Sequence, residues 1–225
     1  HVKPWSFMIV HFIMSLGPEK GWYRVGPLAR INNCVFIPSP LAEEERKEFM
    51  ALGNGEPIHV TLAYHWARMI ELLHAIEAIR ELLLDPDIFG DELVVRGEMA
   101  REGIGVIEAP RGTLFHHYRM NEDGLIEKAN LIVSTTNNNQ AMNESIRQVA
   151  ERYLDGKELT EPLLNQIEVA VRAYDPCLSC ATHALGQMPL HVTLVEEDSG
   201  EVLDGLVRDA DGTVRNEKTS PVSAG

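Results

Sequence analysis

The feature that most constrains the fold of this chain is a long amphipathic stretch between about residues 58 and 84. Its large apolar side chains recur every three or four residues, the period of an α-helix; they are Leu62, Trp66, Met69, Leu72, Leu73, Ile76, Ile79 and Leu83. At about 1.5 Å per residue this helix is near 40 Å long, and we expect it to end at Asp85-Pro86. A helix of this length predicts a helix bundle at the centre of a large domain.

Shorter helices are expected on either side of the long one. The segment 39–52 begins at Ser39, whose side chain suits the N-cap, and has a proline at its first helical position. Two further helices are expected over about 139–154 and 161–173. Residues 1–33 are interrupted by glycine and proline, so we expect mainly loops there.

Between these helices the pattern changes to that of β-strands. Residues 103–118 alternate in polarity around a tight turn at Pro110-Arg111-Gly112, which predicts a hairpin. Asn121–Gly124 makes the next turn, and 125–136 continues as a third strand. We therefore expect an α+β fold that is mostly helical, with a long-helix bundle and a small antiparallel β unit carrying Arg111 on a constrained turn.

Metal-binding side chains are concentrated near the C-terminal end, in Asp175-Pro176-Cys177-Leu178-Ser179-Cys180-Ala181-Thr182-His183. Thiolates are soft ligands that favour nickel, iron, zinc or copper(I). Because proline restricts the residue before it, we expect Asp175 to be extended. Two thiolates make half of a tetrahedral sulfur site, and we expect Cys34 to be a small buried side chain rather than a ligand. Spacing alone leaves three interpretations open: a metal site, a thiol–disulfide couple, or a structural turn.

Composition excludes several functional classes. The net charge of −14 argues against nucleic acid or an anionic membrane surface as a partner. The apolar run Phe7–Met14 is too short for a bilayer, which needs about 20 residues. Three cysteines form no disulfide framework, which favours a reducing cytoplasm. They are also too few for an iron–sulfur cluster beside another metal site, so we expect any electron relay on another chain.

Four stretches together resemble the large, catalytic subunit of [NiFe] hydrogenases. Residues 175–183, D-P-C-x-x-C-x-x-H, are similar to the C-terminal signature of that family. E-A-P-R-G at 108–112 and L-I-V-S-T-T-N at 131–137 resemble two further family segments. G-P-L-A-R at 26–30 resembles the cytoplasmic, pyridine-nucleotide-linked (bidirectional) branch. The general resemblance covers about residues 17–195.

The resemblance implies a Ni-Fe(CN)2(CO) centre and a magnesium ion. Cys177 is implied to be a nickel ligand, Cys180 to bridge nickel and iron, and Asp175 to lie beside the metals. His183 and the backbone carbonyl of Leu131 are implied to bind the magnesium, a cation that takes oxygen ligands and keeps several waters.

The resemblance also implies a pocket for the iron-bound cyanides, lined by Pro110, Arg111 and Thr135. Arg111 suits this place because a guanidinium stays charged, has a rigid donor fork and does not become an accidental ligand. The catalytic residues implied are therefore Arg111, Asp175 and Cys177. Ser134 stands where many members of the family have proline, which loosens the expected backbone constraint. For Arg30, a surface ion pair and a site role remain equally open.

The function implied is reversible oxidation of H2 to protons and electrons. The electrons are expected to pass through an iron–sulfur small subunit to an NAD(P)-reducing diaphorase module in the cytoplasm. Residues 1–183 correspond to the C-terminal part of the large-subunit domain. Residues 184–225 correspond to a propeptide, cut between His183 and Ala184 by a maturation endopeptidase. The alternative is a retained β-tail, with a hairpin over Asp198–Gly200.

The cysteine count limits what this chain does by itself. Nickel takes four thiolates in this family and two are present, so the N-terminal cysteine pair and an acidic proton-gate residue are missing. Since the sequence begins at His1 rather than at methionine, we expect a fragment that is inactive alone. Two alternatives remain: a hydrogenase-derived respiratory-complex subunit without nickel, which usually lacks these cysteines, and an interaction protein with a zinc-binding turn. Nickel content separates them.

Overall fold

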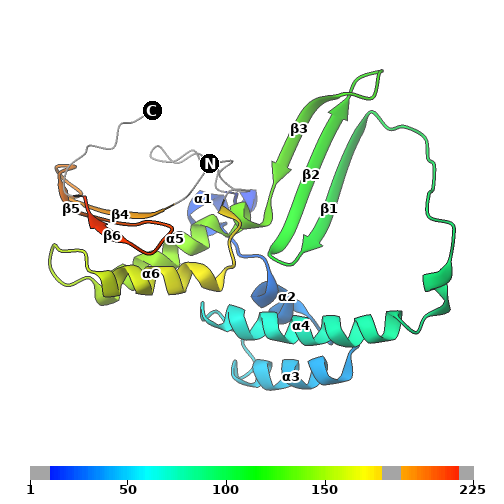
Figure 1. Cartoon of the computed structure of the whole chain (residues 1–225), viewed down its shortest axis with the longest axis horizontal. Coiled ribbons are helices and arrows are strands. Elements are labelled where there is room, and N and C mark those ends of the chain that lie inside the picture. The colour runs from blue at the N-terminus through cyan, green and yellow to red at the C-terminus, as the bar shows by residue number, and fades with distance from the viewer. Residues whose placement is uncertain (1–10, 179–188, 218–225) are drawn as a thin grey trace. The chain divides into compact units, whose positions relative to one another are not determined.

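The computed structural model describes residues 11–178 and 189–217, in two compact units (Figure 1). Unit 1 comprises His1–Tyr23 and Asn138–Gly225, and unit 2 comprises Arg24–Asn137. The predicted site residues Cys180 and His183, together with Ala184, lie outside the described residues. The α+β class predicted from the sequence is confirmed, because helices alternate with two antiparallel sheets.

Unit 2 contains the predicted long helix, α4 (Ala63–Leu82), which forms a helical hairpin with α3 (Pro40–Ala51) (Figure 1). Phe49 of α3 is fully buried and meets the ring of Trp66 edge-on, with ring centroids 5.4 Å apart. Helix α4 starts later than the predicted residue 58, because the chain from 57 to 60 is extended or irregular and the first turn forms at Thr61. The helix is confirmed, and its length is shorter than expected.

The G-P-L-A-R stretch is helical, so the prediction of loops over residues 1–33 was partly wrong. Helix α2 (Pro27–Asn33) has its proline at the first helical position, where a missing N–H costs nothing. Two short helical segments precede it in unit 1, the 3₁₀ segment η1 (Met14–Leu16) and α1 (Gly17–Lys20). Proline therefore marks helix starts here rather than loops.

Helix α3 is capped by a side chain from α4 rather than by Ser39 as predicted. The Ser39 hydroxyl is hydrogen-bonded to His74 Nδ1 at 2.7 Å. The backbone N–H groups of Leu41 and Ala42 instead donate to the Glu77 carboxylate, at 3.2 and 3.0 Å. A carboxylate suits the positive end of a helix, so the helical hairpin itself provides the cap.

One face of α4 carries an open apolar stripe. Its members are each about half exposed or more, and are spaced alternately by three and four residues: Met69, Leu72, Ile76, Ile79 and Leu83. That spacing is typical of a seam between two helices. Among the described residues, the only part of the predicted bundle in unit 2 is the α3–α4 hairpin, and the apolar stripe of α4 is left uncovered. None of the described helices is long and apolar enough to cross a bilayer.

The β unit of unit 2 is a three-stranded antiparallel sheet in the order β1-β2-β3. Strand β1 (Glu102–Ala109) pairs with β2 (Gly112–Met120), and β2 pairs with β3 (Ile126–Ile132). The predicted hairpin and its turn are confirmed. The third strand is shorter than predicted, since α5 (Ser134–Tyr153) begins at residue 134. The N–H groups of residues 136 and 137 already bond back to the carbonyl of Val133.

Unit 1 packs a second sheet on its two helices. Helix α6 (Glu161–Ala173) and most of α5 form one layer, and β4 (Leu190–Val195), β5 (Val202–Arg208) and β6 (Val214–Asn216) form the other (Figure 1). The buried residues between them are Leu159, Leu163, Leu164, Ile167 and Leu206. The two helices and the β4–β5 hairpin confirm the prediction, whereas strand β6 was not foreseen.

Candidate functional site

The turn that carries Arg111 is shaped by a glycine that no other residue could replace without strain. Pro110 and Arg111 connect β1 and β2, whose last pair is Ala109 with Gly112. Gly112 has a φ of 135°, and a Cβ there would lie 2.3 Å from Val25 Cγ2. The Arg111 side chain is exposed. The hairpin end therefore presents Arg111 from a tightly specified backbone.

The start of the G-P-L-A-R stretch lies directly against this turn. Gly26 has φ 100° and ψ −166°, a region that is essentially restricted to glycine. A Cβ on Gly26 would lie 2.8 Å from the backbone oxygen of Arg111. The close approach of the two backbones thus depends on the absence of a side chain at residue 26.

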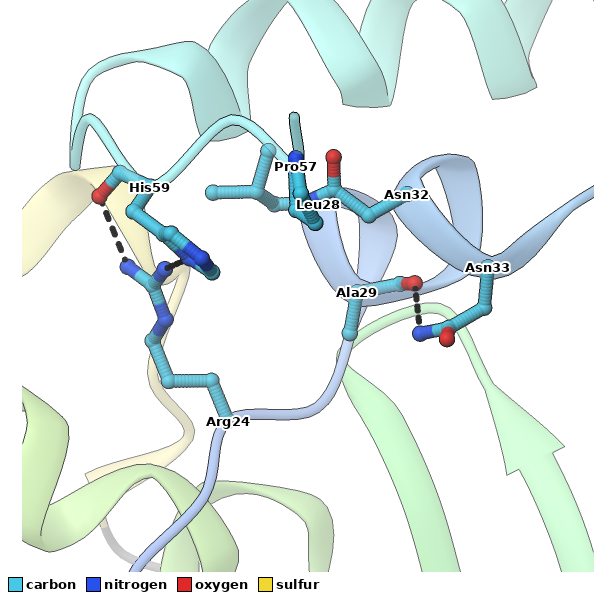
Figure 2. Close-up of a pocket in the computed structure, with 7 residues that line it drawn as sticks. All are labelled: Arg24, Leu28, Ala29, Asn32, Asn33, Pro57 and His59. Carbon is cyan, nitrogen blue, oxygen red and sulfur yellow. Dashed lines mark hydrogen bonds between the residues drawn. The ribbon is translucent and has the colours of Figure 1, made fainter. Parts of the chain in front are cut away.

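The residues just before Gly26 are anchored to the chain that precedes α4 and to the first turn of that helix. The Arg24 side chain reaches to His59 (Figure 2). Both residues line a cavity of about 240 Å³. The Arg24 guanidinium donates to the His59 carbonyl at 3.1 Å and lies 2.8 Å from His59 Nδ1. The buried Tyr64 donates its hydroxyl hydrogen to the Val25 carbonyl at 3.0 Å. Segment 24–26 is therefore fixed in place before it meets the turn.

Arg30, at the other end of G-P-L-A-R, binds the same turn with its whole guanidinium. Nε and Nη2 donate to the two carboxylate oxygens of Glu71, at 2.6 and 2.7 Å. Nη1 donates to Glu108 at 2.8 Å and to the Ala109 carbonyl at 2.9 Å, and Nη2 donates to the Pro110 carbonyl at 2.9 Å. Burial lowers the pKa of Arg30, but the hydrogen bonds to Glu71 and Glu108 outweigh it and raise the pKa.

The start of α5 holds the other half of the turn. The buried Ser134 donates its hydroxyl hydrogen to the Gly112 carbonyl at 2.7 Å, and Asn137 Nδ2 donates to the Thr113 carbonyl at 3.0 Å. Thr135 lies between them and is 3% exposed. The expected loss of constraint at Ser134 is therefore offset by a hydrogen bond. Three of the four matched stretches meet around the Arg111 turn.

The contact at Gly26 yields a stability prediction. Gly26→Ala is expected to lower the free energy of unfolding by about 1–3 kcal/mol from backbone strain, and further because the new methyl group meets the Arg111 carbonyl. Gly55→Ala is the matched control, because Gly55 has a φ of 93° and a Cβ there would have nothing within 4 Å. Urea unfolding of both variants measures the difference. Equal losses would show that residue 26 does not support the turn.

In unit 1, the approach to the D-P-C stretch is set by the end of α6. Tyr174 caps the helix, is 2% exposed, and shares a hydrogen bond of 2.9 Å with Ser145. Asp175 has a φ of 48°, in the left-handed region, so the prediction of an extended residue was wrong. Its N–H bonds back to the Arg172 carbonyl at 3.0 Å. A left-handed residue after the last turn is a common helix ending, and aspartate tolerates it better than most side chains.

Cys177 follows as a half-buried side chain. The form of this residue that binds a metal is the thiolate. Within the described residues, no three His, Cys, Asp or Glu side chains cluster as a metal site. Cys34 is a free thiol, half-buried rather than buried as predicted, that donates to the Phe36 carbonyl at 2.8 Å. The sulfur donors of the D-P-C-x-x-C stretch fit nickel and iron in kind, and they supply half of a four-thiolate set.

Comparison with known proteins decides between the interpretations left open. Residues 19–183 match the model of a family described as nickel-dependent hydrogenase. The chain belongs to the nickel-dependent hydrogenase family. This membership confirms the resemblance inferred from the four stretches and favours it over a zinc-binding interaction protein. The roles of Arg111, Asp175, Cys177 and the other matched residues stay predictions.

This nickel-dependent hydrogenase chain spans less than half the length of the curated relatives it matches. It is 52% identical to the NAD-reducing hydrogenase HoxS subunit beta of Cupriavidus necator, over 92% of this chain and 43% of that relative. It is 44% identical to a chain of the F420-non-reducing hydrogenase of Methanothermobacter thermautotrophicus, over 90% and 43% respectively. A crystal structure of an NAD+-reducing [NiFe]-hydrogenase in the H2-reduced state matches with a TM-score of 0.76 and 53% identity, over 81% of this chain and 40% of that one.

Proposed function

We propose that this chain is the C-terminal part of the catalytic large subunit of an NAD(P)-linked [NiFe] hydrogenase. The reaction is H2 ⇌ 2H⁺ + 2e⁻. The observation that carries the proposal is the Arg111 turn, which two other matched stretches hold by their side chains and backbone. The NAD-reducing activity named for the Cupriavidus relative supports NAD(P) as the electron acceptor.

In the proposed enzyme, the D-P-C-x-x-C-x-x-H stretch holds the metals. Cys177 and Cys180 would hold nickel, Cys180 would also hold iron, and His183 and the Leu131 carbonyl would hold magnesium. When bound, the Ni-Fe(CN)2(CO) centre supplies the redox chemistry that splits H2. The two remaining nickel thiolates and the proton-gate acid are assigned to the part of the relatives' length that this chain does not span.

The other matched residues shape the pocket and handle the proton. The Arg111 guanidinium has a rigid donor fork and no acceptor, so it would serve as a fixed hydrogen-bond donor towards an iron-bound cyanide. Pro110 and Thr135 line the same pocket. The Cys177 thiolate would be the base that takes up the proton released from H2, and Arg111 is the alternative base. Asp175 lies beside it at the end of α6 and stabilises positive charge.

The electrons leave through other chains. The whole chain has three cysteines, two of which the metal centre uses, so an iron–sulfur relay has no ligands here. The partners proposed are an iron–sulfur small subunit, together with an NAD(P)-reducing diaphorase module, in the cytoplasm. The test is H2-dependent dye reduction by the complete native complex under H2 and under argon. Reduction under H2 alone supports the function, and its absence from a complex that reduces the dye with NADH contradicts it.

Residues 184–225 are proposed to be a propeptide that a maturation endopeptidase removes at His183-Ala184. In unit 1 the described part of this tail is well anchored: Leu206 joins the core with Leu163, and the buried Asp204 accepts the Leu159 N–H at 2.7 Å. A hydrogen bond to a buried charge contributes about 1.5–3 kcal/mol. Removal of the tail therefore exposes an apolar face of α6 that another surface must cover.

The tail prediction is tested by mass. The large-subunit chain is isolated from the native complex under denaturing conditions and its intact mass is measured. We expect a chain that ends at His183. A mass that includes residues 184–225 in a nickel-containing, active complex would establish a retained β-tail instead.

A further inference from the structure

We propose that Arg30 is a positioning residue for Arg111, holding the backbone of the turn that presents the Arg111 guanidinium. The inference deepens the proposed function and rests on it for the role of Arg111. Arg30 lies 78 to 80 residues before its partners in the turn, so no local sequence pattern joins them. It acts through the turn and is not itself assigned a contact with the metals.

The guanidinium of Arg30 uses its full donor capacity. Arginine has five N–H donors in one plane, and Arg30 makes five hydrogen bonds: two to Glu71, one to Glu108, and one each to the carbonyls of Ala109 and Pro110. The two carboxylates fix the plane of the fork, and the two remaining donors then point at consecutive backbone oxygens. A surface ion pair needs only one or two of these bonds.

Glu71 sets the orientation of the Arg30 guanidinium. It lies on α4 outside the open stripe, and it grips Nε and Nη2 with both carboxylate oxygens. The two side chains are each about one quarter exposed, so the pair is partly shielded from water. Because α4 is long and packed on α3, Glu71 gives Arg30 a rigid support. Arg30 thus links the turn to α4 and fixes the position of the turn relative to that helix.

The two halves of the turn have different supports. Arg30 binds the carbonyls of Ala109 and Pro110, whereas side chains of α5 bind those of Gly112 and Thr113. Loss of the Arg30 fork therefore frees one side of the turn and leaves the other attached. The expected consequence is a rotated or mobile Arg111 on a folded hairpin, rather than loss of the sheet.

The test compares Arg30→Lys with a matched control, Arg46→Lys. Arg46 lies in the same unit and donates to Glu43 through Nε at 2.7 Å and Nη2 at 2.8 Å, and to the Cys34 carbonyl through Nη1 at 3.3 Å. Lysine keeps the charge but has three donors on a single nitrogen, so it cannot bind four groups in one plane. We expect faster hydrogen–deuterium exchange over residues 108–112 in Arg30→Lys, and unchanged exchange there in Arg46→Lys.

The enzymatic readout is a double-mutant cycle in the complete complex. Arg30→Lys is expected to lower kcat about 10- to 100-fold, as for other residues that orient a metal site from outside, with nickel content unchanged. In an Arg111→Lys background, the same substitution is expected to add little, because its effect passes through Arg111. The positioning role would be overturned if the kcat losses of Arg30→Lys and Arg111→Lys multiplied in the double variant. It would also be overturned if Arg30→Lys lost nickel in proportion to activity.

The exchange experiment separates this inference from the proposed function. It is made on the complete complex and reports the protection of backbone N–H groups rather than metal chemistry, so unchanged exchange over 108–112 in Arg30→Lys refutes the inference even in an active hydrogenase. Faster exchange in a complex without H2 activity would uphold the structural link and refute the function. If Arg30→Lys does not fold, Glu71→Gln removes the support while keeping Arg30, and the same local increase in exchange is required.

Discussion

Replacement of Cys177 by serine is expected to remove nickel from the assembled hydrogenase and to lower H2-dependent dye reduction more than about 100-fold, beyond the loss typical of residues that only orient a metal ligand. A serine hydroxyl is a hard donor that stays protonated at neutral pH, so it cannot replace a soft thiolate at nickel. Elemental analysis of the purified complex gives nickel and iron per large subunit, and dye reduction gives the activity of the same sample.

The control for Cys177→Ser is Cys34→Ser. Cys34 is a free thiol in unit 2 whose sulfur donates to the Phe36 carbonyl, a bond that serine also makes. We expect this variant to keep its nickel and its activity. If Cys177→Ser retained wild-type nickel, or if both variants lost it equally, Cys177 would not be a ligand.

Arg111→Lys is expected to lower H2 oxidation about 100- to 1000-fold, as for loss of one fixed donor at a reacting centre. Lysine keeps the positive charge but lacks the planar fork, so its donors do not hold the same direction. Because Arg111 is not assigned as a metal ligand, nickel and iron are expected to remain at wild-type levels. The measurement is kcat for dye reduction, normalised to nickel.

Arg119→Lys is the matched control for Arg111→Lys. Arg119 lies on the adjoining strand, β2, and makes an exposed ion pair with Glu127 at 3.5 Å. Exposed pairs contribute about 0–1 kcal/mol, so this variant is expected to behave as wild type. Retention of activity by Arg111→Lys would refute its role as a donor. An equal loss in both variants would point to a general effect of altering the hairpin.

The elements of this fold were foreseeable where their signal is local. Apolar periodicity predicted α4, alternation around Pro110-Arg111-Gly112 predicted the β1–β2 hairpin, and Pro40 marked the start of α3. Each signal lies within one stretch of chain, so neighbouring residues are enough to read it. The family resemblance could also be recognised from the sequence, because each of its four motifs is an unbroken stretch of residues.

Other features were missed because they depend on residues far apart in the chain. Glu77 of α4, not Ser39, caps α3, and the Arg30 fork joins α2, α4 and the hairpin. Ser134 looked like a weakened position, although its hydroxyl binds the Gly112 carbonyl 22 residues away. At Asp175, the preference set by the following proline lost to the geometry of the α6 terminus. Tertiary contacts override local propensity at the first three of these points, whereas at Asp175 two local preferences compete.

The most direct test of the hydrogenase function is the metal content of the complete native complex that contains this chain. Nickel and iron are counted per large subunit in a sample whose subunit composition has been verified by mass spectrometry. We expect about one nickel per large subunit, as one metal centre held by Cys177 and Cys180 requires, together with iron in excess of what the iron–sulfur subunits hold. A folded, assembled complex without nickel would leave Cys177 and Cys180 as a structural or zinc-binding pair, and would contradict the hydrogenase function proposed for the chain.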